Sequence, residues 1–338
     1  MRGKRDLIAN LSAATGATWL MERMPHRPVL TILNYHRIGD ASATEYDSGL
    51  FSCTAQEFDW QIGYLKQRYR MTTLDEVLEL LASGNRLTEP RVLITFDDGY
   101  IDNYRLAYPV LRRHGVQGVF FAPTAFVGTG RIPWWDAVAY IVKHSRQQRI
   151  RLEYPQVQEF DLAADGAARS IMNILRLYKQ PAMRDHERFM EQLERACDAT
   201  RPSEGTARCF LNWDEAREMV QSGMAFGSHT HNHEILSKQT AAAQLEELNV
   251  SRAILEAELK QKIDTLAYPV GARDTFSPDT VEALKQAKYR AAFSFYTGFN
   301  LAGSMAPFDI RRCGVDQQSR SRLRLQTAVG ALAGNVWF

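Results

Sequence analysis

The stretch "RVLITFDDG", residues 91–99, joins a run of apolar residues directly to a pair of carboxylates. The apolar run predicts a buried strand, and Gly99 allows the chain to turn after Asp97 and Asp98. An Asp-Asp-Gly sequence by itself is usually a solvated turn, so the pair needs support from elsewhere in the chain. In a barrel of parallel strands the carboxyl ends of the strands converge on the active site. The two carboxylates are therefore candidate site residues.

A second strand-like stretch, "AFGSHTHNH" (225–233), also ends in candidate ligands. It holds three of the eight histidines of the chain, His229, His231 and His233. Histidine is the commonest metal ligand, and two histidines four residues apart can turn toward one point. One carboxylate and two imidazoles with an open position are typical of catalytic zinc, and a second carboxylate can act as general base. The two stretches together predict a metal site with a base beside it.

The rest of the chain alternates between short apolar runs and helical patterns, which indicates a parallel α/β fold. Residues 131–212 interrupt this alternation, because they contain charged helical patterns and no convincing strand. We interpret them as a helical insertion between the third and fourth strands. The expected strands are residues 29–36, 91–98, 117–124, 225–230, 265–270 and 291–295, with 311–316 as the seventh.

At this point the sequence resembles the polysaccharide deacetylases of carbohydrate esterase family four. "TFDDG" (95–99) is the first motif of that family, and "HTHNH" (229–233) fits its second motif, H-[ST]-x-x-H. The resemblance covers roughly residues 27–317. It implies a distorted (β/α) barrel of about seven parallel strands and a divalent metal ion, usually zinc. It also implies that Asp97 is the catalytic base, that Asp98, His229 and His233 are the metal ligands, and that His231 is a side chain at the rim.

The third motif of the family is altered here to "AYPVG" (267–271). Pro269 and Gly271 keep the expected loop shape, and the backbone N–H of Val270 falls where the family places its oxyanion donor. By the same resemblance, Tyr268 and Pro269 are expected at the substrate.

Two functional side chains of the family are missing at their usual positions. Ala267 stands where many members have the arginine that orients the base, and we expect Arg312 to replace it; a salt bridge at the barrel rim is the alternative. The usual histidine that serves as general acid is absent, because no histidine follows His233. His36 in "NYHRIG" (34–39) is the candidate for that role, and a buried structural histidine is its alternative.

Two adjacent tryptophans, Trp134 and Trp135, open the insertion in "RIPWWDAVAY" (131–140). They are either core anchors of the helical segment or a wall on which sugar rings stack. We retain them as candidate substrate-binding residues.

Composition excludes several classes of protein. The net charge of +2 points to no polyanionic partner, so nucleic acid is not expected. The four cysteines form no CxxC pair, which argues against a zinc ribbon or a thioredoxin-type motif. A disulfide framework is not expected in a chain of 338 residues, and we expect buried, reduced cysteines.

The first 26 residues are basic at the start and then only weakly apolar. The apolar part makes a poor signal-peptide core and is too polar and short to span a bilayer. Its stripe instead predicts an amphipathic helix that either packs on the domain or rests on a membrane surface. We expect a cytoplasmic protein with a peripheral membrane contact, and a periplasmic or exported protein is the alternative. The residues of the stripe are Leu7, Leu11, Ala14, Thr18 and Met21.

These observations predict a metal-dependent hydrolase that removes N-acetyl groups from a polysaccharide or oligosaccharide and releases acetate. The barrel is expected over residues 27–317, followed by a helical tail at 318–338. One alternative is an amide hydrolase of the same fold that acts on cyclic imides or ureides. Another is a catalytically inactive glycan-binding module, although the presence of all three expected ligands and the base argues against it.

Overall fold

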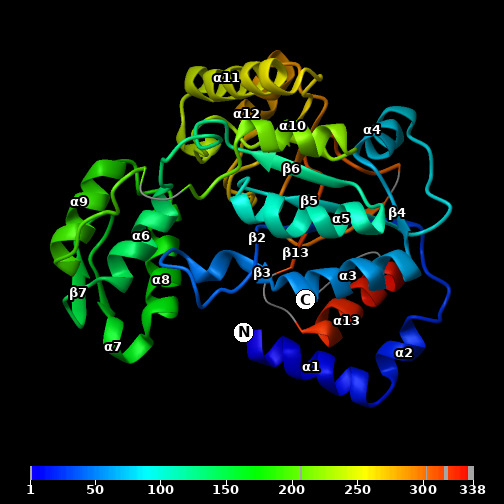
Figure 1. Ribbon diagram of the computed structural model, residues 1–338, viewed down its shortest axis with the longest axis horizontal. Helices are drawn as coiled ribbons and strands as arrows, with labels where there is room; N and C mark the ends of the chain where they lie inside the picture. Colours follow the sequence, from blue (N-terminus) through cyan, green and yellow to red (C-terminus); the bar gives the residue numbers. More distant parts are fainter. Residues whose placement is uncertain (1, 206–207, 302, 316–318, 334–338) are drawn as a thin grey trace. The chain divides into compact units, whose positions relative to one another are not determined.

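A computed structural model describes residues 2–205, 208–301, 303–315 and 319–333 of the chain (Figure 1). It divides into two compact units. The barrel unit comprises residues 1–39, 52–128 and 210–338, and the insert unit comprises residues 40–51 and 129–209. No helix among the described residues is long and apolar enough to cross a membrane.

Six parallel strands of the barrel unit lie side by side in the order in which they occur in the chain. Every residue of the first of them is buried, as its apolar sequence predicts. They are β1 (Val29–Tyr35), β5 (Arg91–Phe96), β6 (Gly118–Ala122), β9 (Ala225–Ser228), β10 (Thr265–Ala267) and β11 (Ala291–Phe293).

A segment near the C-terminus joins the two outer strands of this sheet. Ile310 bridges to Phe293 of β11, and Cys313 in β13 (Cys313–Gly314) pairs with Leu33 of β1. The expected distorted (β/α) barrel of about seven strands is thereby confirmed. Two further short strands were not predicted: β4 (Arg70–Met71) pairs with β5, and β12 (Asn300–Leu301) pairs antiparallel with β1, so the sheet is mixed.

Alternate residues of each strand face opposite sides of the sheet. In β1, Leu30 and Ile32 belong to one apolar cluster with Phe121 and Phe293, whereas Leu33 and Tyr35 belong to another. Asn34 falls in the same row as Leu30 and Ile32, and its side chain therefore enters the barrel interior.

Helices of the barrel unit connect the strands, and all of those named below except α5 begin at a residue with a capping side chain. The Thr73 hydroxyl accepts a hydrogen bond from the Glu76 N–H while Glu76 reaches back, and Ser277 and Thr280 form the same type of capping box. The helices are α3 (Ala55–Arg68), α4 (Leu74–Ser83), α5 (Tyr108–His114), α10 (Trp213–Gln221), α11 (Ala241–Leu259) and α12 (Pro278–Gln286), with one π-helical turn, η2 (Asn103–Ala107), and one 3-10 turn, η3 (Leu236–Lys238).

The described part of the chain begins and ends with helices that lie together. The N-terminal α1 (Arg2–Ala14) and α2 (Ala17–Met21) lie beside the C-terminal α13 (Arg320–Ala333), as Figure 1 shows in blue and red. Residues 316–318 and 334–338, which belong to the end of the expected barrel and to the expected tail, lie outside the described part of the chain.

The insert unit has its own apolar core and is not wholly helical. Our expectation of no strand within residues 131–212 is wrong, because β7 (Arg149–Leu152) and β8 (Gln158–Asp161) form an antiparallel hairpin. Residues 40–51, which contain the 3-10 turn η1 (Ser48–Leu50), also belong to this unit. Where the chain first enters and leaves this unit, β2 (Arg37–Ile38) pairs with β3 (Phe51–Cys53). Its helices are α6 (Trp134–Lys143), α7 (Leu162–Asp165), α8 (Ala167–Lys179) and α9 (His186–Cys197).

Candidate active site

Three buried side chains from two strand ends converge on one point of the barrel unit. Asp98 follows β5, and His229 and His233 follow β9. The Asp98 Oδ1 atom lies 3.5 Å from His229 Nε2 and 3.3 Å from His233 Nε2, and one ligand atom of each residue lies within 4.8 Å of the others. All three side chains are buried. The strands β5 and β9 flank β6 and run parallel to it, so their carboxyl ends bring together residues that lie far apart in the sequence.

The donor set fits a divalent metal ion of the zinc type. The Nδ1 atom of His229 bonds to the carbonyl oxygen of Ala267 at 2.7 Å, which leaves Nε2 to face Asp98. Two atoms bound to tetrahedral zinc at about 2.0–2.1 Å lie roughly 3.3–3.4 Å apart, close to the two measured separations. Burial by itself raises the pKa of Asp98, but the two imidazoles outweigh it and the net pKa lies well below its ordinary value. Asp98 is therefore a carboxylate at neutral pH, as a ligand must be.

The backbone at this site is strained. Seven non-glycine residues of the described chain have a positive φ, and four of them lie in the site loops: Asp98 (70°), Thr230 (63°), His233 (58°) and Val270 (62°). A left-handed conformation is especially unfavourable for a β-branched residue such as Val270. Strain of this kind persists where the surrounding structure holds it, and it concentrates at functional sites.

Asp97, next to the ligand Asp98, is held by Arg312 and Asn34. Arg312 donates from Nη1 to Asp97 Oδ1 at 2.7 Å and from Nη2 to Oδ2 at 2.8 Å, and the Asn34 amide donates to Oδ2 at 3.0 Å. Burial raises the pKa of Asp97, but the charges of Arg312 and His229 outweigh it and the net shift is downward. Arg312 is fully buried, so the alternative of a salt bridge at the barrel rim is wrong. The carboxylate is ionised and fixed in direction.

The loop after β10 offers a backbone donor. No backbone hydrogen bond found among the described residues uses the N–H of Val270. Gly271, with φ 66°, is required beside it, since a Cβ there would lie 2.6 Å from both the nitrogen and the Cβ of Phe295. The Gly271 carbonyl accepts from the Phe295 N–H at 2.7 Å, which ties this loop to the end of β11.

His36 lies within electrostatic range of both aspartates, because its charge lowers the pKa of each of them. Its ring meets Phe295 edge-on, with centroids 5.4 Å apart. Its backbone is fixed on both sides: its N–H donates to Ser52 Oγ at 3.0 Å, and its carbonyl accepts from the Asn103 amide at 2.7 Å. The half-buried ring is therefore on the metal-site side of β1.

The histidine loop is supported by a carboxylate that the sequence analysis missed. Glu247 on α11 accepts from the backbone N–H of His231 at 2.9 Å and from that of Asn232 at 2.8 Å, and the Asn232 amide donates to it at 2.7 Å. His231 itself bonds through Nδ1 to Thr124 Oγ1 at 2.8 Å and is not among the three grouped ligands.

Three other supporting residues were also missed. Asn34 was visible as a polar residue inside an apolar strand, and Asp102 and Asn103 as a polar pair one turn after the Asp-Asp-Gly sequence. Asp102 accepts from the backbone N–H of Ile38 at 2.9 Å, so the pair holds the segment that carries His36.

Two of the expected substrate-binding side chains are buried elsewhere. The side chain of Tyr268 packs on Phe276 with ring centroids 4.1 Å apart, and its hydroxyl donates to the Phe308 carbonyl, so its assignment to the substrate is wrong. Pro269 is also buried, within the loop. Trp135 is 5% exposed in the core of the insert unit, so its assignment as a sugar platform is wrong as well.

Trp134 lies in the insert unit too. One face of its ring is covered by Tyr178, with ring centroids 3.9 Å apart. Trp135 is therefore a core anchor, whereas Trp134 is half-buried and its role toward the substrate stays a prediction. The cysteines carry no disulfide, and Cys53, Cys197 and Cys313 are buried while Cys209 is half-buried.

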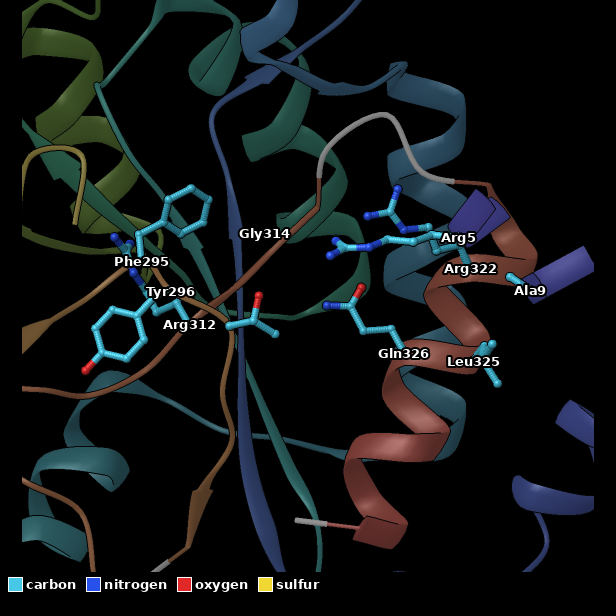
Figure 2. Close-up of a pocket in the computed structure, with 10 residues that line it drawn as sticks. Arg5, Ala9, Phe295, Tyr296, Arg312, Gly314, Arg322, Leu325 and Gln326 are labelled. Carbon is cyan, nitrogen blue, oxygen red and sulfur yellow. The ribbon is translucent and has the colours of Figure 1, made fainter. Parts of the chain in front are cut away.

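A cavity of about 330 Å³ lies where α1, α13 and the segments around β13 meet (Figure 2). Figure 2 shows Phe295, Tyr296 and Arg312 on one side of it and Arg5 and Arg322 on the other. None of the three grouped ligands lines it. The inward face of α1 is thus part of a polar cavity of the protein.

Comparison with known proteins identifies the class. The sequence profile of the polysaccharide deacetylase family matches residues 84–153 and 157–292, more than half of the chain, so the chain belongs to that family. A protein of Bacillus subtilis (strain 168) named "Putative polysaccharide deacetylase YxkH" is 22% identical over 275 residues. The match covers 81% of this chain and 66% of YxkH, so the chain spans slightly less than two thirds of that relative.

Solved structures share the fold. The deacetylase PplD of Streptococcus pyogenes, determined in complex with acetate, has a TM-score of 0.57 at 19% identity and covers 89% of this chain and 98% of its own. IcaB of Ammonifex degensii also has a TM-score of 0.57, at 22% identity, and covers 91% of this chain and 99% of its own.

Proposed function

We propose that this protein is a metal-dependent hydrolase that removes N-acetyl groups from the N-acetylhexosamine units of a glycan and releases acetate. One observation carries the proposal: a buried Asp-His-His donor set lies next to a second carboxylate that is ionised, oriented by an arginine and not needed as a ligand. A base beside a catalytic metal site is the arrangement that amide hydrolysis by water requires.

Asp98, His229 and His233 would hold a divalent metal ion. We infer zinc, because zinc is commonly bound by carboxylate and imidazole ligands with one position left open. When bound, the ion supplies Lewis acidity toward water and toward the acetyl carbonyl. Asp97 accepts the proton of the attacking water. Arg312 keeps both oxygens of that carboxylate in place and ionised.

Two further groups act on the developing charges. The Val270 N–H is directed at the negative charge that forms on the acetyl oxygen, and a donor of this kind stabilises the tetrahedral transition state. The amide C–N bond then breaks, and the sugar nitrogen leaves as an amine after it has received a proton from His36. Water supplies one oxygen of the acetate. One of its hydrogens goes to Asp97 and the other is released when the acetic acid ionises. Transfer of the proton from Asp97 to His36 through solvent restores both side chains, so atoms and protons balance.

Membership of the polysaccharide deacetylase family supports a glycan as the substrate class. The acetate in the PplD structure supports acetate as the product, by analogy of fold.

Acetate release from a panel of N-acetylated oligosaccharides tests the proposal. The parent protein is stripped of metal by a chelator and then assayed alone and after addition of zinc or other divalent ions. We expect release only with metal, and none from Asp97→Asn protein that has bound the same amount of metal. A cyclic imide serves as the alternative amide substrate. Hydrolysis of the imide without acetate release, or glycan binding without turnover, would contradict the proposal.

A further inference from the structure

Large apolar side chains are exposed on the two N-terminal helices and on the turn that follows them. Among the described residues nine large apolar side chains are exposed, and six of them fall within residues 7–24. Each of the six is between 48% and 68% exposed. We call these six the N-terminal patch: Leu7, Ile8, Leu11, Trp19, Leu20 and Met24.

Helical periodicity explains the position of the patch on α1. Leu7, Leu11 and Lys4 follow one another at intervals of three or four residues, so they share one face of the helix. Ala9, on another face, is fully buried, and Asp6 accepts a hydrogen bond from the Ser319 hydroxyl at 3.0 Å. The helix therefore packs through small and polar residues and turns its apolar side to the solvent. This is the reverse of an ordinary surface helix. Of the predicted stripe, Leu7, Leu11 and Ala14 are exposed rather than packed on the domain, whereas Thr18 is buried.

Near the patch, the acidic side chains face the protein and two basic side chains face the solvent. Glu22 is buried and bound by Arg324, which donates to both of its oxygens at 2.8 Å. Asp6 is likewise turned toward the C-terminal segment. By contrast, Lys4 and Arg23 are exposed, and the Arg23 guanidinium lies over the ring of Trp19, 3.8 Å from its centroid. The exposed charge at the patch is therefore positive, because the acidic side chains of these helices are used for packing.

We propose that the N-terminal patch is a membrane-docking site that binds the surface of a bilayer rich in anionic lipids. Apolar side chains at such a surface enter the boundary between headgroups and acyl chains, while lysine and arginine contact lipid phosphates. A tryptophan with an adjacent cation suits this boundary, since the ring is apolar and its edge is polar.

The same charges disfavour a second copy of the chain as the occupant. A two-fold interface would place the patch against itself, with Lys4 and Arg23 of both copies close together and the acids already engaged. An anionic lipid surface complements these cations. The inference is independent of the proposed function, because none of the patch residues belongs to the candidate active site.

Vesicle sedimentation of the full chain tests the inference. Vesicles of phosphatidylcholine alone are compared with vesicles of phosphatidylcholine and phosphatidylglycerol. We expect the protein to sediment with the mixed vesicles and to bind them less as salt is added, because salt screens the attraction to the headgroups.

Substitutions separate the apolar and the ionic contributions. The double variant Leu7→Gln/Leu11→Gln should bind the mixed vesicles about tenfold more weakly or worse. Each substitution removes apolar groups that the parent would bury in the bilayer. The double variant Lys4→Gln/Arg23→Gln should bind them about fivefold more weakly for each cation removed. The matched control is Val157→Gln/Met172→Gln, which alters two other exposed apolar residues, of the insert unit, and should bind like the parent. Thermal unfolding of each variant verifies the fold.

Three outcomes would overturn the inference. The parent protein fails to bind the mixed vesicles, or Leu7→Gln/Leu11→Gln binds them as well as the control variant does. The third outcome is measured by light scattering without vesicles. If the parent is a dimer and Leu7→Gln/Leu11→Gln is a monomer, the patch serves self-association.

Discussion

Arg312 and Asp97 lie 215 residues apart in the sequence, yet the guanidinium of one donates to both carboxylate oxygens of the other inside the barrel. The same Nη1 also donates to Asn34 Oδ1 at 2.7 Å, and Nε donates to the Ser294 carbonyl at 3.1 Å. This set of bonds fixes the direction of the arginine as well as that of the base. Ala267 stands where the resemblance places an arginine that orients the base, and we propose that Arg312 takes over that role.

Arg312→Lys should therefore impair catalysis while keeping the positive charge. Lysine is a point charge and cannot reproduce the two parallel hydrogen bonds to Asp97. We expect kcat to fall about 10²-fold, the cost of a slightly misplaced catalytic group. Steady-state kinetics measures this, and Arg311→Lys at the neighbouring half-buried position is the control. Activity equal to that of the parent would show that Asp97 needs no two-point support.

Replacement of a ligand should remove the metal. We expect His229→Ala to lose most of its bound zinc, because only two of the three ligands remain. His231→Ala in the same loop should keep it, since His231 bonds to Thr124 and is not among the grouped ligands. Elemental analysis of the purified proteins gives the metal content. Stoichiometric zinc in His229→Ala, or loss of zinc in His231→Ala, would refute the ligand assignment.

Glu247 should tune the affinity for the metal through the backbone of the histidine loop. It accepts three hydrogen bonds from His231 and Asn232, and the neighbouring His233 is a candidate ligand. We expect Glu247→Gln to bind zinc about tenfold more weakly, as is common when a supporting partner of a metal site is changed. Its kcat at saturating zinc should stay close to that of the parent. Glu246→Gln, on the exposed side of the same helix, is the control, and equal zinc affinity in the two variants would count against this role.

Glu22 should make the docking of the N-terminal helices sensitive to acid. Burial raises its pKa, but Arg324, Tyr64 and Arg68 outweigh burial, and the net pKa lies below its ordinary 4.5. The stabilisation by the charged form is complete above pH 4.5 and is lost as the pH falls through the lowered pKa. The difference in Tm between the parent and Glu22→Gln should thus be largest near neutrality and shrink below pH 4.5. The control Glu79→Gln, at an exposed site, should have the same Tm as the parent at each pH. A Tm difference between the parent and Glu22→Gln that grows as the pH falls would contradict the stabilising role of the Glu22 carboxylate.

The barrel and its metal-site candidates could be predicted from the sequence because both depend on local patterns. Apolar runs indicated the strands. The polar residues directly after β5 and β9 lie at the same edge of the sheet, because these two strands flank β6 and all three run parallel. The supporting bonds could not be predicted. The contact between Asn34 and Arg312 depends on closure of the barrel across 278 residues of sequence, and Glu247 lies on a helix whose rotation is set by packing.

The orientation of α1 was beyond sequence analysis for a related reason. A helical stripe of apolar residues shows that one face is apolar, but it does not say what covers that face. Here Asp6 marks the packed side of α1, because it bonds to Ser319 just before α13 and lies near Arg322 on α13, while Leu7 and Leu11 point outward. The β7–β8 hairpin was missed because each of its strands is only four residues long and rich in charged side chains. So few apolar residues give no clear strand pattern.

The last prediction concerns the proton that the departing amine requires. The usual histidine is absent, and His36 is the histidine whose charge acts on both Asp97 and Asp98 without being a grouped ligand. His36→Gln should lower kcat for an N-acetylated oligosaccharide by roughly 10²-fold, the low end for loss of a general acid. Metal content should stay unchanged, and His144→Gln is the control.

A second substrate separates catalysis from structure. The leaving group of p-nitrophenyl acetate departs without a proton, so its hydrolysis does not need a general acid. If His36 donates the proton, His36→Gln should hydrolyse this ester nearly as fast as the parent while it fails on the amide. If His36 only supports the fold of the site, both reactions should slow together. Equal slowing would leave Asp97 as the residue that both removes the proton from water and returns it to the amine.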